Sequence, residues 1–287
     1  MRAVRVVTPQ DLELRLVVGD VAIPPAFESS GHLTGIVEGF ERFGAMSRWR
    51  PLAGEPATST PMDDCVFGPP LSVPGRIVGI GLNFELHAGD LAAAVPRRPV
   101  VFFKGDHTVV GPGETTEIPI DSRRVTAEAE LGLVIGTAAY RVDPSRALDY
   151  VGGVCCVLDF TAEDILLEDP RLLTLSKNYP GFFAYGPEIA SLEDVIEAAG
   201  SLDAIAIATY VNGRCHRSGT VRQMMHGLAQ LVSFISHFMP LRPGDLISTG
   251  TPGAAVVVGG DVAECRITGL RPLTSRVSDS RSTAAEL

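Results

Sequence analysis

The sequence lacks the features that mark membrane, secreted and nucleic-acid-binding proteins. Its apolar runs are far shorter than the roughly 18 residues that a membrane-spanning helix needs. Charged residues interrupt the N-terminal segment MRAVRVVTPQDLELRL too often for a signal peptide. The formal net charge is -10 and no basic stripe is present. We therefore expect a soluble protein that has neither a membrane nor a nucleic acid as its partner.

Cysteine is also sparse, with five residues and no Cys-x-x-Cys pair. Because the number is odd and no pair has the spacing of zinc ligands, disulfides and a thiolate zinc site are both disfavoured. Cysteine usage therefore predicts a reducing, cytoplasmic location.

A complete dinucleotide-binding motif is missing as well. Gly79 and Gly81 supply the first two glycines of Gly-x-Gly-x-x-Gly, but Phe84 occupies the third position. The same segment carries His87 and Asp90, whose spacing of three puts them on one face of a helical turn. A carboxylate beside an imidazole orients it and raises its basicity, which suits a general base. The alternative is a surface histidine near an incidental aspartate.

Short strands dominate the sequence from residue 76 onward. Most segments there are β-branched or apolar and are bounded by Gly, Pro or Asp. Only residues 220–237 show a long helical pattern, and shorter helices are expected after Asn83 and over residues 191–199. Many strands with few helices predict an α+β fold that is mainly β, and argue against a doubly wound α/β fold.

The composition divides the chain into three parts. Residues 1–70 are irregular and rich in Pro and Gly, and we expect them to form a small N-terminal subdomain with one short helix in TGIVEGFERFGAM. A catalytic domain is expected over residues 71–278. The polar end of the chain, residues 279–287, is expected to be a disordered tail.

A pair of acids is the central chemical signal. The segment VTAEAELGLVIG places Glu128 and Glu130 two residues apart at the start of an apolar strand. That spacing puts both side chains on one face of the strand. Two such carboxylates repel unless a cation or a proton lies between them, and a hard divalent cation meets that demand. The alternative is a solvated strand end with two exposed acids.

A third carboxylate is expected from the segment VCCVLDFTAEDI. Asp164 follows a strongly apolar strand, where a turn or the start of a helix would project its side chain. Asp159 and Glu163 compete for the same role, and spacing alone does not decide between them. Three carboxylates would leave about three octahedral positions for water or substrate.

Two lysines and a glycine-rich turn complete the candidates. Lys177 lies between an apolar stretch and a turn, where a surface charge is the ordinary expectation, whereas Lys104 follows four apolar residues. The segment LISTGTPGA is an apolar strand that runs into Gly250 and Thr251. Backbone N–H groups and a hydroxyl at such a turn can cradle a carboxylate. The alternative is simply a tight turn.

Taken together and in this order, the segments resemble the fumarylacetoacetate hydrolase family. GLNFELHAGD is similar to the family's GLNY-x-x-HAxE, AEAELGLVIG to its E-x-EL-x-VIG and FTAEDI to its YTxxND(V/I). Further matches lie in PVVFFKGDHTVVGPGETTEIP, in SKNYPGFFAYGPEI and in the block from VNG to STGTP. Six weak motifs in the correct order cover about residues 76–268. Within the family, the resemblance is to the bacterial branch of acylpyruvases and 2-hydroxyhepta-2,4-diene-1,7-dioate isomerases.

The resemblance implies a curled, mixed β-sheet roll, usually a homodimer, that binds Mg²⁺ or Mn²⁺ through three acids. Carried over to this sequence, the metal ligands are Glu128, Glu130 and Asp164. The catalytic residues that it implies are His87, its partner Asp90, and Lys177. The residues that it assigns to the substrate are Phe84, Lys104, Arg171, Gly250 and Thr251.

The activity that the resemblance implies is metal-dependent chemistry on a small 2-oxo acid. The metal would polarise the keto group and stabilise the enolate that forms when a C–C or C–H bond breaks. Hydrolysis of an acylpyruvate-like C–C bond or decarboxylation is the leading expectation. An isomerase or dehydratase would use the same enolate chemistry, and a non-catalytic metal-binding protein is the third possibility.

The sequence also departs from the family pattern around the expected substrate. In the alignment that makes Asp164 the metal ligand, Glu163 replaces an asparagine and Glu168 replaces an arginine that often grips the substrate. Arg171 then stands where many members have glutamine, and Pro180 replaces an acid. We therefore expect a metal site that keeps the family's ligands, a substrate-binding surface that differs from the family pattern, and an unusual substrate.

Overall fold

The computed structural model describes residues 1–8, 11–27, 31–32, 35–49, 59–71, 74–84, 97–279 and 281. The strands are β1 (Arg2–Val7), β2 (Leu12–Val18), β3 (Val21–Ile23), β4 (Ala26–Phe27), β5 (Gly31–His32), β6 (Thr60–Pro61), β7 (Phe67–Gly68), β8 (Ile77–Gly81), β9 (Val100–Lys104), β10 (Val109–Val110), β11 (Thr115–Ile118), β12 (Val125–Ile135), β13 (Val151–Ala162), β14 (Phe183–Ala190), β15 (Ala206–Val211), β16 (Arg214–Thr220), β17 (Leu246–Ser248), β18 (Ala254–Val257), β19 (Val262–Ile267) and β20 (Leu273–Asp279).

Helices are fewer and shorter. The α-helices are α1 (Ile36–Phe43), α3 (Glu163–Glu168), α4 (Leu173–Lys177), α5 (Leu192–Ala199) and α6 (Leu228–Phe238). The 3₁₀ turns are η1 (Met46–Arg48), η3 (Met62–Asp64), η4 (Asp106–Thr108), η5 (Pro144–Tyr150), η6 (Pro170–Leu172), η7 (Leu202–Ala204) and η8 (Val221–Gln223). None of the helices in the described ranges is long and apolar enough to cross a membrane.

The main sheet is built around the antiparallel pair β12 and β13. Within the described residues it has 13 strands, and its central path runs β6-β3-β2-β1-β14-β13-β12-β17-β8-β9. The β12–β13 register places Glu128 opposite Asp159 and Thr126 opposite Thr161. Because directly opposed residues point to the same side of a sheet, these four side chains share one face.

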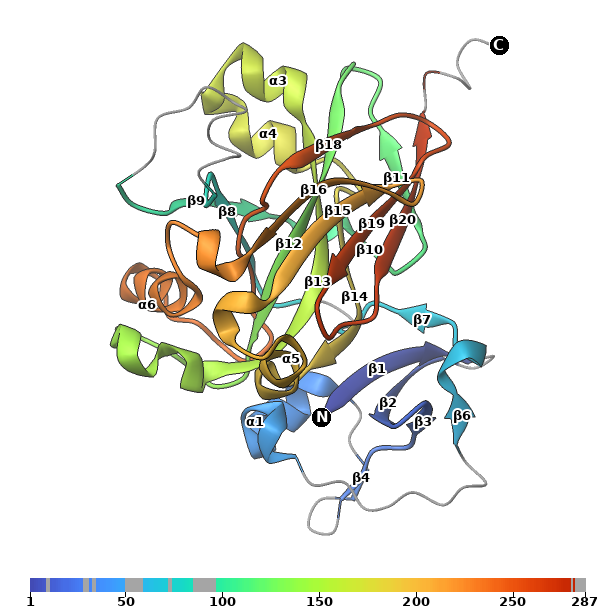
Figure 1. Ribbon diagram of the computed structural model, residues 1–287, viewed down its shortest axis with the longest axis vertical. Coiled ribbons are helices and arrows are strands. Elements are labelled where there is room, and N and C mark those ends of the chain that lie inside the picture. Colours follow the sequence, from blue (N-terminus) through green and yellow to red (C-terminus); the bar gives the residue numbers. More distant parts are fainter. Residues whose placement is uncertain are drawn as a thin grey trace.

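A second sheet covers the other face of this pair. Its strand order is β11-β20-β19-β15-β16, and Figure 1 shows it in front of β12 and β13. The alternate residues Ala127, Ala129, Leu131 and Leu133 of β12 enter the apolar core shared with β15, β19 and α6. Burial of this face fixes the register, since a slip by one residue would turn the two glutamates into the core.

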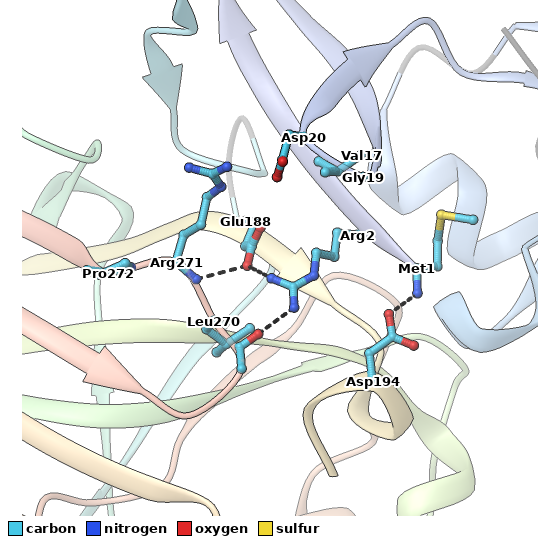
Figure 2. Close-up of a pocket in the computed structure, with 11 residues that line it drawn as sticks. Met1, Arg2, Val17, Gly19, Asp20, Glu188, Asp194, Leu270, Arg271 and Pro272 are labelled. Atoms are coloured by element: carbon cyan, nitrogen blue, oxygen red, sulfur yellow. Dashed lines mark hydrogen bonds and ion pairs between the residues drawn. The ribbon is translucent and has the colours of Figure 1, made fainter. Parts of the chain in front are cut away.

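The N-terminal strands extend the main sheet through β1, which pairs with β14. Figure 2 shows the cavity at this joint, about 650 Å³ in volume. Arg2 Nη1 donates to Glu188 Oε1 at 2.5 Å, and its Nη2 donates to the Gly269 carbonyl at 2.6 Å. The backbone N–H of Arg271 donates to the same Glu188 oxygen at 3.0 Å. These bonds fasten the N-terminal strand to β14 and to the turn before β20.

The predicted helices have different outcomes. The short helix in TGIVEGFERFGAM is confirmed as α1, and the helix over residues 191–199 is confirmed as α5, which Ser191 caps at its N-terminus. The helix predicted over residues 220–237 is wrong at its start, because α6 begins only at Leu228. Thr220 ends β16, and a capping box with Gln223 closes the separate turn η8. The helix predicted after Asn83 lies outside the described residues.

The predicted fold class, α+β and mainly β, is confirmed by the many strands of these sheets. The boundary expected at residue 70 stays a prediction, since the N-terminal strands share a sheet with the rest of the chain. Strand β20 runs to Asp279, where the predicted tail begins. Arg281 bonds to Asp279 and to the Ser122 carbonyl, and the other tail residues after Asp279 lie outside the described ranges.

Candidate active site

Three acids meet on the face of the β12–β13 pair that is turned away from the second sheet. Carboxylate oxygens of Glu128, Glu130 and Asp159 all lie within 4.8 Å of one another, and all three residues are buried. The two glutamates come from the alternating face of β12, and Asp159 lies opposite Glu128 in the register of β13. Close packing of three buried carboxylates carries a repulsion that only protons or cations can relieve.

Lys177 lies between two of the acids. Its Nζ donates to Glu128 Oε2 at 3.0 Å and to Asp159 Oδ2 at 2.6 Å. Burial by itself lowers the pKa of Lys177, but the surrounding carboxylates raise that pKa above its ordinary value. In the metal-free protein the side chain is therefore protonated near neutral pH.

Lys104 lies on the other side of Asp159. Its Nζ donates to Asp159 Oδ1 at 2.5 Å and to the Phe160 carbonyl at 3.2 Å, with no solvent exposure of the side chain. Burial lowers the pKa of Lys104 to about 8, although Asp159 opposes the shift. The structure thus places Lys104 behind an acid, where it orients the carboxylate, and not on the wall of the cavity where a substrate would lie.

Glu130 is held by the glycine-rich turn. Ser248 Oγ donates to Glu130 Oε2 at 2.5 Å, and the backbone N–H of Gly250 donates to the same oxygen at 2.8 Å. Burial raises the pKa of Glu130 to about 8, and the neighbouring Asp159 and Glu128 add to the shift, which Lys177 partly opposes. The predicted carboxylate cradle therefore exists, but in this structure it binds one of the protein's own acids.

A cavity of about 380 Å³ opens beside the acids. Its lining consists of one polar end and a long apolar wall. The polar residues are Glu128, Glu130, Thr161, Glu163, Lys177 and Thr251, and the others are Ile80, Gly81, Leu82, Val100, Phe102, Leu166, Leu167, Pro170 and Leu173. A small organic acid could lie with its polar end against the acids and its remainder along the apolar wall.

The expectation that Asp164 joins the two glutamates requires correction. Its carboxylate accepts from Ser122 Oγ at 2.7 Å and from the backbone N–H of Arg123 at 2.7 Å. The reason is that β13 continues to Ala162, so Asp159 stays on the strand face that Glu128 shares. Asp164 instead falls in the first turn of α3 and faces the loop before β12. Asp159, the competitor from the same segment, occupies the third position.

The replacements inferred at Glu163, Glu168 and Arg171 depended on aligning Asp164 with the family's metal ligand. Aligning Asp159 with that ligand instead shifts the alignment of this segment by five residues, so those replacements no longer follow. Glu168 is exposed at the end of α3. Arg171 is also exposed and forms an ion pair with Asp169 at 2.5 Å, so the structure does not place it at the cavity.

The other residues assigned to the substrate are divided between two places. Thr251 lines the acid cavity, and its hydroxyl donates to the Gly253 carbonyl at 3.0 Å. Phe84 is buried and bridges to Met224, beside a separate cavity of about 290 Å³. His87 and Asp90 lie outside the described residues, so their roles remain predictions.

Sequence reasoning missed several residues that support the acids. Thr161 Oγ1 donates to Glu128 Oε1 at 2.6 Å, and Ser248 anchors Glu130. Thr161 follows Asp159 by two residues on the same strand, and this alternation is the signal that could have indicated both. Ser248 gave no comparable signal, because its partner is 118 residues away in sequence.

The donor set fits a hard divalent cation. It consists only of carboxylate oxygens, the type of ligand that Mg²⁺ and Mn²⁺ prefer. Each carboxylate is oriented by hydrogen bonds from neighbouring groups, as metal-binding acids usually are. Two lysines pair with these three acids, so one negative charge is left without a counter-charge among them. A dication between the acids would supply the missing positive charge.

Known proteins share both sequence and fold with this chain. The family model described as fumarylacetoacetate (FAA) hydrolase C-terminal matches residues 76–278. An uncharacterized protein of Pyrococcus horikoshii is 33% identical over 201 residues, which cover 69% of this chain and 85% of that protein. The crystal structure of 2-hydroxyhepta-2,4-diene-1,7-dioate isomerase from Mycobacterium marinum matches with a TM-score of 0.78 at 27% identity, covering 97% of this chain and 98% of that one. A fumarylacetoacetate hydrolase from Exiguobacterium antarcticum has a TM-score of 0.80 at 24% identity, over 97% of this chain and 99% of that one, and is similar in fold.

The pKa of Glu130 predicts how stability depends on pH in metal-free protein. Folding raises this pKa from 4.5 to about 8, so the folded state holds a proton that the unfolded state loses within this window. The free energy of unfolding should therefore fall as pH rises from about 5 to 8, by up to about 4 kcal/mol from this group. Urea denaturation of wild type and Glu130→Gln across this range measures the effect, with the exposed Glu117→Gln as control. An unchanged pH slope in Glu130→Gln would contradict the assignment.

Proposed function

Because the chain belongs to the fumarylacetoacetate hydrolase family, we propose that it is a divalent-metal-dependent enzyme that acts on a small 2-oxo acid. The proposed reaction is hydrolysis of an acylpyruvate-like C–C bond or decarboxylation. The observation that carries this proposal is the group of three buried carboxylates, Glu128, Glu130 and Asp159, of which the two glutamates line the polar end of a cavity with an apolar wall.

The proposed metal ligands are Glu128, Glu130 and Asp159, and the ion is Mg²⁺ or Mn²⁺. When bound, such an ion supplies Lewis acidity toward a keto oxygen and a carboxylate. The protein's contribution is to hold the acids in place before substrate arrives. Thr161 fixes Glu128 Oε1, and Ser248 and the Gly250 N–H both fix Glu130 Oε2, so that little rearrangement of the glutamates is needed.

Lys177 is the proposed electrostatic catalyst among the described residues. It lines the cavity, and its ammonium group donates hydrogen bonds to Glu128 and Asp159. A fixed cation there stabilises negative charge that develops on a substrate oxygen. Asp159 and Glu128 hold the ammonium group in place, so its position does not depend on the substrate.

A general base is also required, to activate water or to move a carbon-bound proton. The three acids are the proposed metal ligands and Lys177 is paired with two of them, so we assign this role to neither type of residue. We assign it to His87, oriented by Asp90, on the strength of the family resemblance. An imidazole has its ordinary pKa near neutrality, which is what such proton transfer needs.

An isomerase acting on a related dienoate is the second candidate. Its support is the 27% identity and matching fold of the Mycobacterium marinum protein, which is named as a 2-hydroxyhepta-2,4-diene-1,7-dioate isomerase. Both reactions need the same electrophilic stabilisation and one mobile proton, so they share the site proposed here. A homodimer and a cytoplasmic location belong to the same proposal and rest on the family resemblance and on cysteine usage.

A substrate screen tests the proposed function. Acylpyruvates, oxaloacetate and 2-oxo-enoic acids are incubated with Mg²⁺ or Mn²⁺, and products are identified by mass spectrometry. We expect turnover of at least one substrate that chelator abolishes and that Glu130→Ala lowers by at least about 100-fold. Equal turnover and equal metal binding in wild type and Glu130→Ala would contradict the proposal of a metalloenzyme. Metal binding without reaction of any 2-oxo acid would favour a binding protein.

The division of labour between acids and histidine has a separate test. His87→Ala should reduce kcat by about 100-fold or more, because it removes proton transfer. Its affinity for Mn²⁺, measured by calorimetry, should stay within about twofold of wild type, since His87 is not a proposed ligand. Parallel loss of turnover and metal affinity would show that His87 belongs to the metal site instead.

A further inference from the structure

The far part of the acid cavity is apolar. Beyond the three carboxylates, its wall is formed by side chains that carry no charge: Leu82, Val100, Phe102, Leu166, Leu167 and Leu173. Leu167 is 58% exposed, so the wall includes a large aliphatic side chain that is accessible to water. An apolar ligand chain placed there would remove this surface from water, which favours binding.

One further acid, Glu163, interrupts this wall. It follows Thr161 by two residues, where β13 passes into α3, and it is 8% exposed. Thr161 lies between Asp159 and Glu163 along the chain, and Thr161 and Glu163 both line the cavity, so Glu163 lies on the side of Thr161 away from Asp159. Its carboxylate is bonded by Arg124, whose side chain is 51% exposed and does not line the cavity. The cavity therefore presents a carboxylate, and not the guanidinium, to its contents.

No spare cation faces Glu163 within the described lining. Lys177 is the lining lysine, and it is already shared by two carboxylates. Arg171, on the turn after α3, is exposed and paired with Asp169. Residues 85–96 contain neither lysine nor arginine, and their one histidine, His87, is already assigned as the general base. A second carboxylate on a substrate would meet the Glu163 carboxylate with no lining cation to pair with, because Arg124, the partner of Glu163, does not line the cavity.

We infer that this site selects a 2-oxo acid with a single carboxylate and an apolar acyl chain, and that Glu163 discriminates against a second carboxylate at the distal end. This inference rests on the proposed function and narrows its substrate class. It also separates this chain from the Mycobacterium marinum isomerase, whose named substrate is a dioate with two carboxylates.

The charge balance of the site agrees with one carboxylate. The three acids and two lysines leave one negative charge, and a dication changes this to one positive charge. The carboxylate of a 2-oxo acid then neutralises the polar end. A second carboxylate would be in excess there and would lie near the like charge of Glu163, an arrangement that costs more in a buried site than in water.

The test compares two ligands of equal chain length, 2-oxohexanoate and 2-oxoadipate, which end in a methyl group and a carboxylate respectively. Binding is measured by calorimetry in saturating Mg²⁺, so that the readout does not require turnover. Wild type should bind 2-oxohexanoate at least about tenfold more tightly than 2-oxoadipate. Shortening the monoacid to 2-oxobutanoate should weaken binding by about fourfold for each methylene that leaves the wall.

Glu163→Gln tests the residue itself, and Glu168→Gln is the matched control because Glu168 is an exposed acid on the same helix. In Glu163→Gln, affinity for 2-oxoadipate should rise at least about fivefold, while affinity for 2-oxohexanoate stays within twofold and verifies folding. Glu168→Gln should change neither affinity.

Three results would overturn parts of this account in distinguishable ways. Equal affinity of wild type for the two ligands would refute the inference while leaving the proposed function standing. Strong discrimination that persists in Glu163→Gln would refute the role of Glu163. Absence of Mg²⁺-dependent binding of either 2-oxo acid would contradict the proposed function, and the inference with it.

Discussion

The mutual repulsion of three buried carboxylates is the constraint on which this site depends. Glu128, Glu130 and Asp159 are brought within 4.8 Å by two long strands whose other face is packed into the core. Neither strand can slip to separate the acids without exposing that core. The protein offsets part of the repulsion with two buried lysines and part with hydrogen bonds from Thr161, Ser248 and Gly250. A divalent cation would relieve the rest. The negative charge of the acids that the lysines leave uncompensated is therefore what would attract the cation.

Much of the site follows from local sequence pattern. The spacing of Glu128 and Glu130 predicted a shared strand face, and the structure places both on β12 as expected. The motifs in their order also predicted the family, which the match over residues 76–278 confirms. These features were predictable because they depend on strand alternation and on residues that are close in sequence.

Other features depend on where an element ends or on contacts between distant residues, and sequence pattern does not specify these. Asp164 was chosen because it follows the strand at the expected start of a helix; α3 does begin there, but it turns the Asp164 carboxylate toward Ser122 and Arg123. The start of α6 was misplaced because the apolar spacing around Met224 also suits a bridge to Phe84. Lys104 was taken for a substrate contact, since its strand reveals nothing about Asp159, 55 residues away. The position of Glu163 on the wall of the cavity also depends on distant segments, because the same cavity is lined by residues of β8, β9 and β12.

The central claim, that Asp159 completes the metal site, is tested most directly by metal affinity. Mn²⁺ binding is measured by calorimetry for wild type, Asp159→Asn and Asp164→Asn, two conservative changes only five residues apart. The account predicts that Asp159→Asn weakens Mn²⁺ binding by at least about 100-fold, more than loss of a supporting group does, while Asp164→Asn stays within a few-fold of wild type. Retained affinity in Asp159→Asn together with lost affinity in Asp164→Asn would contradict it.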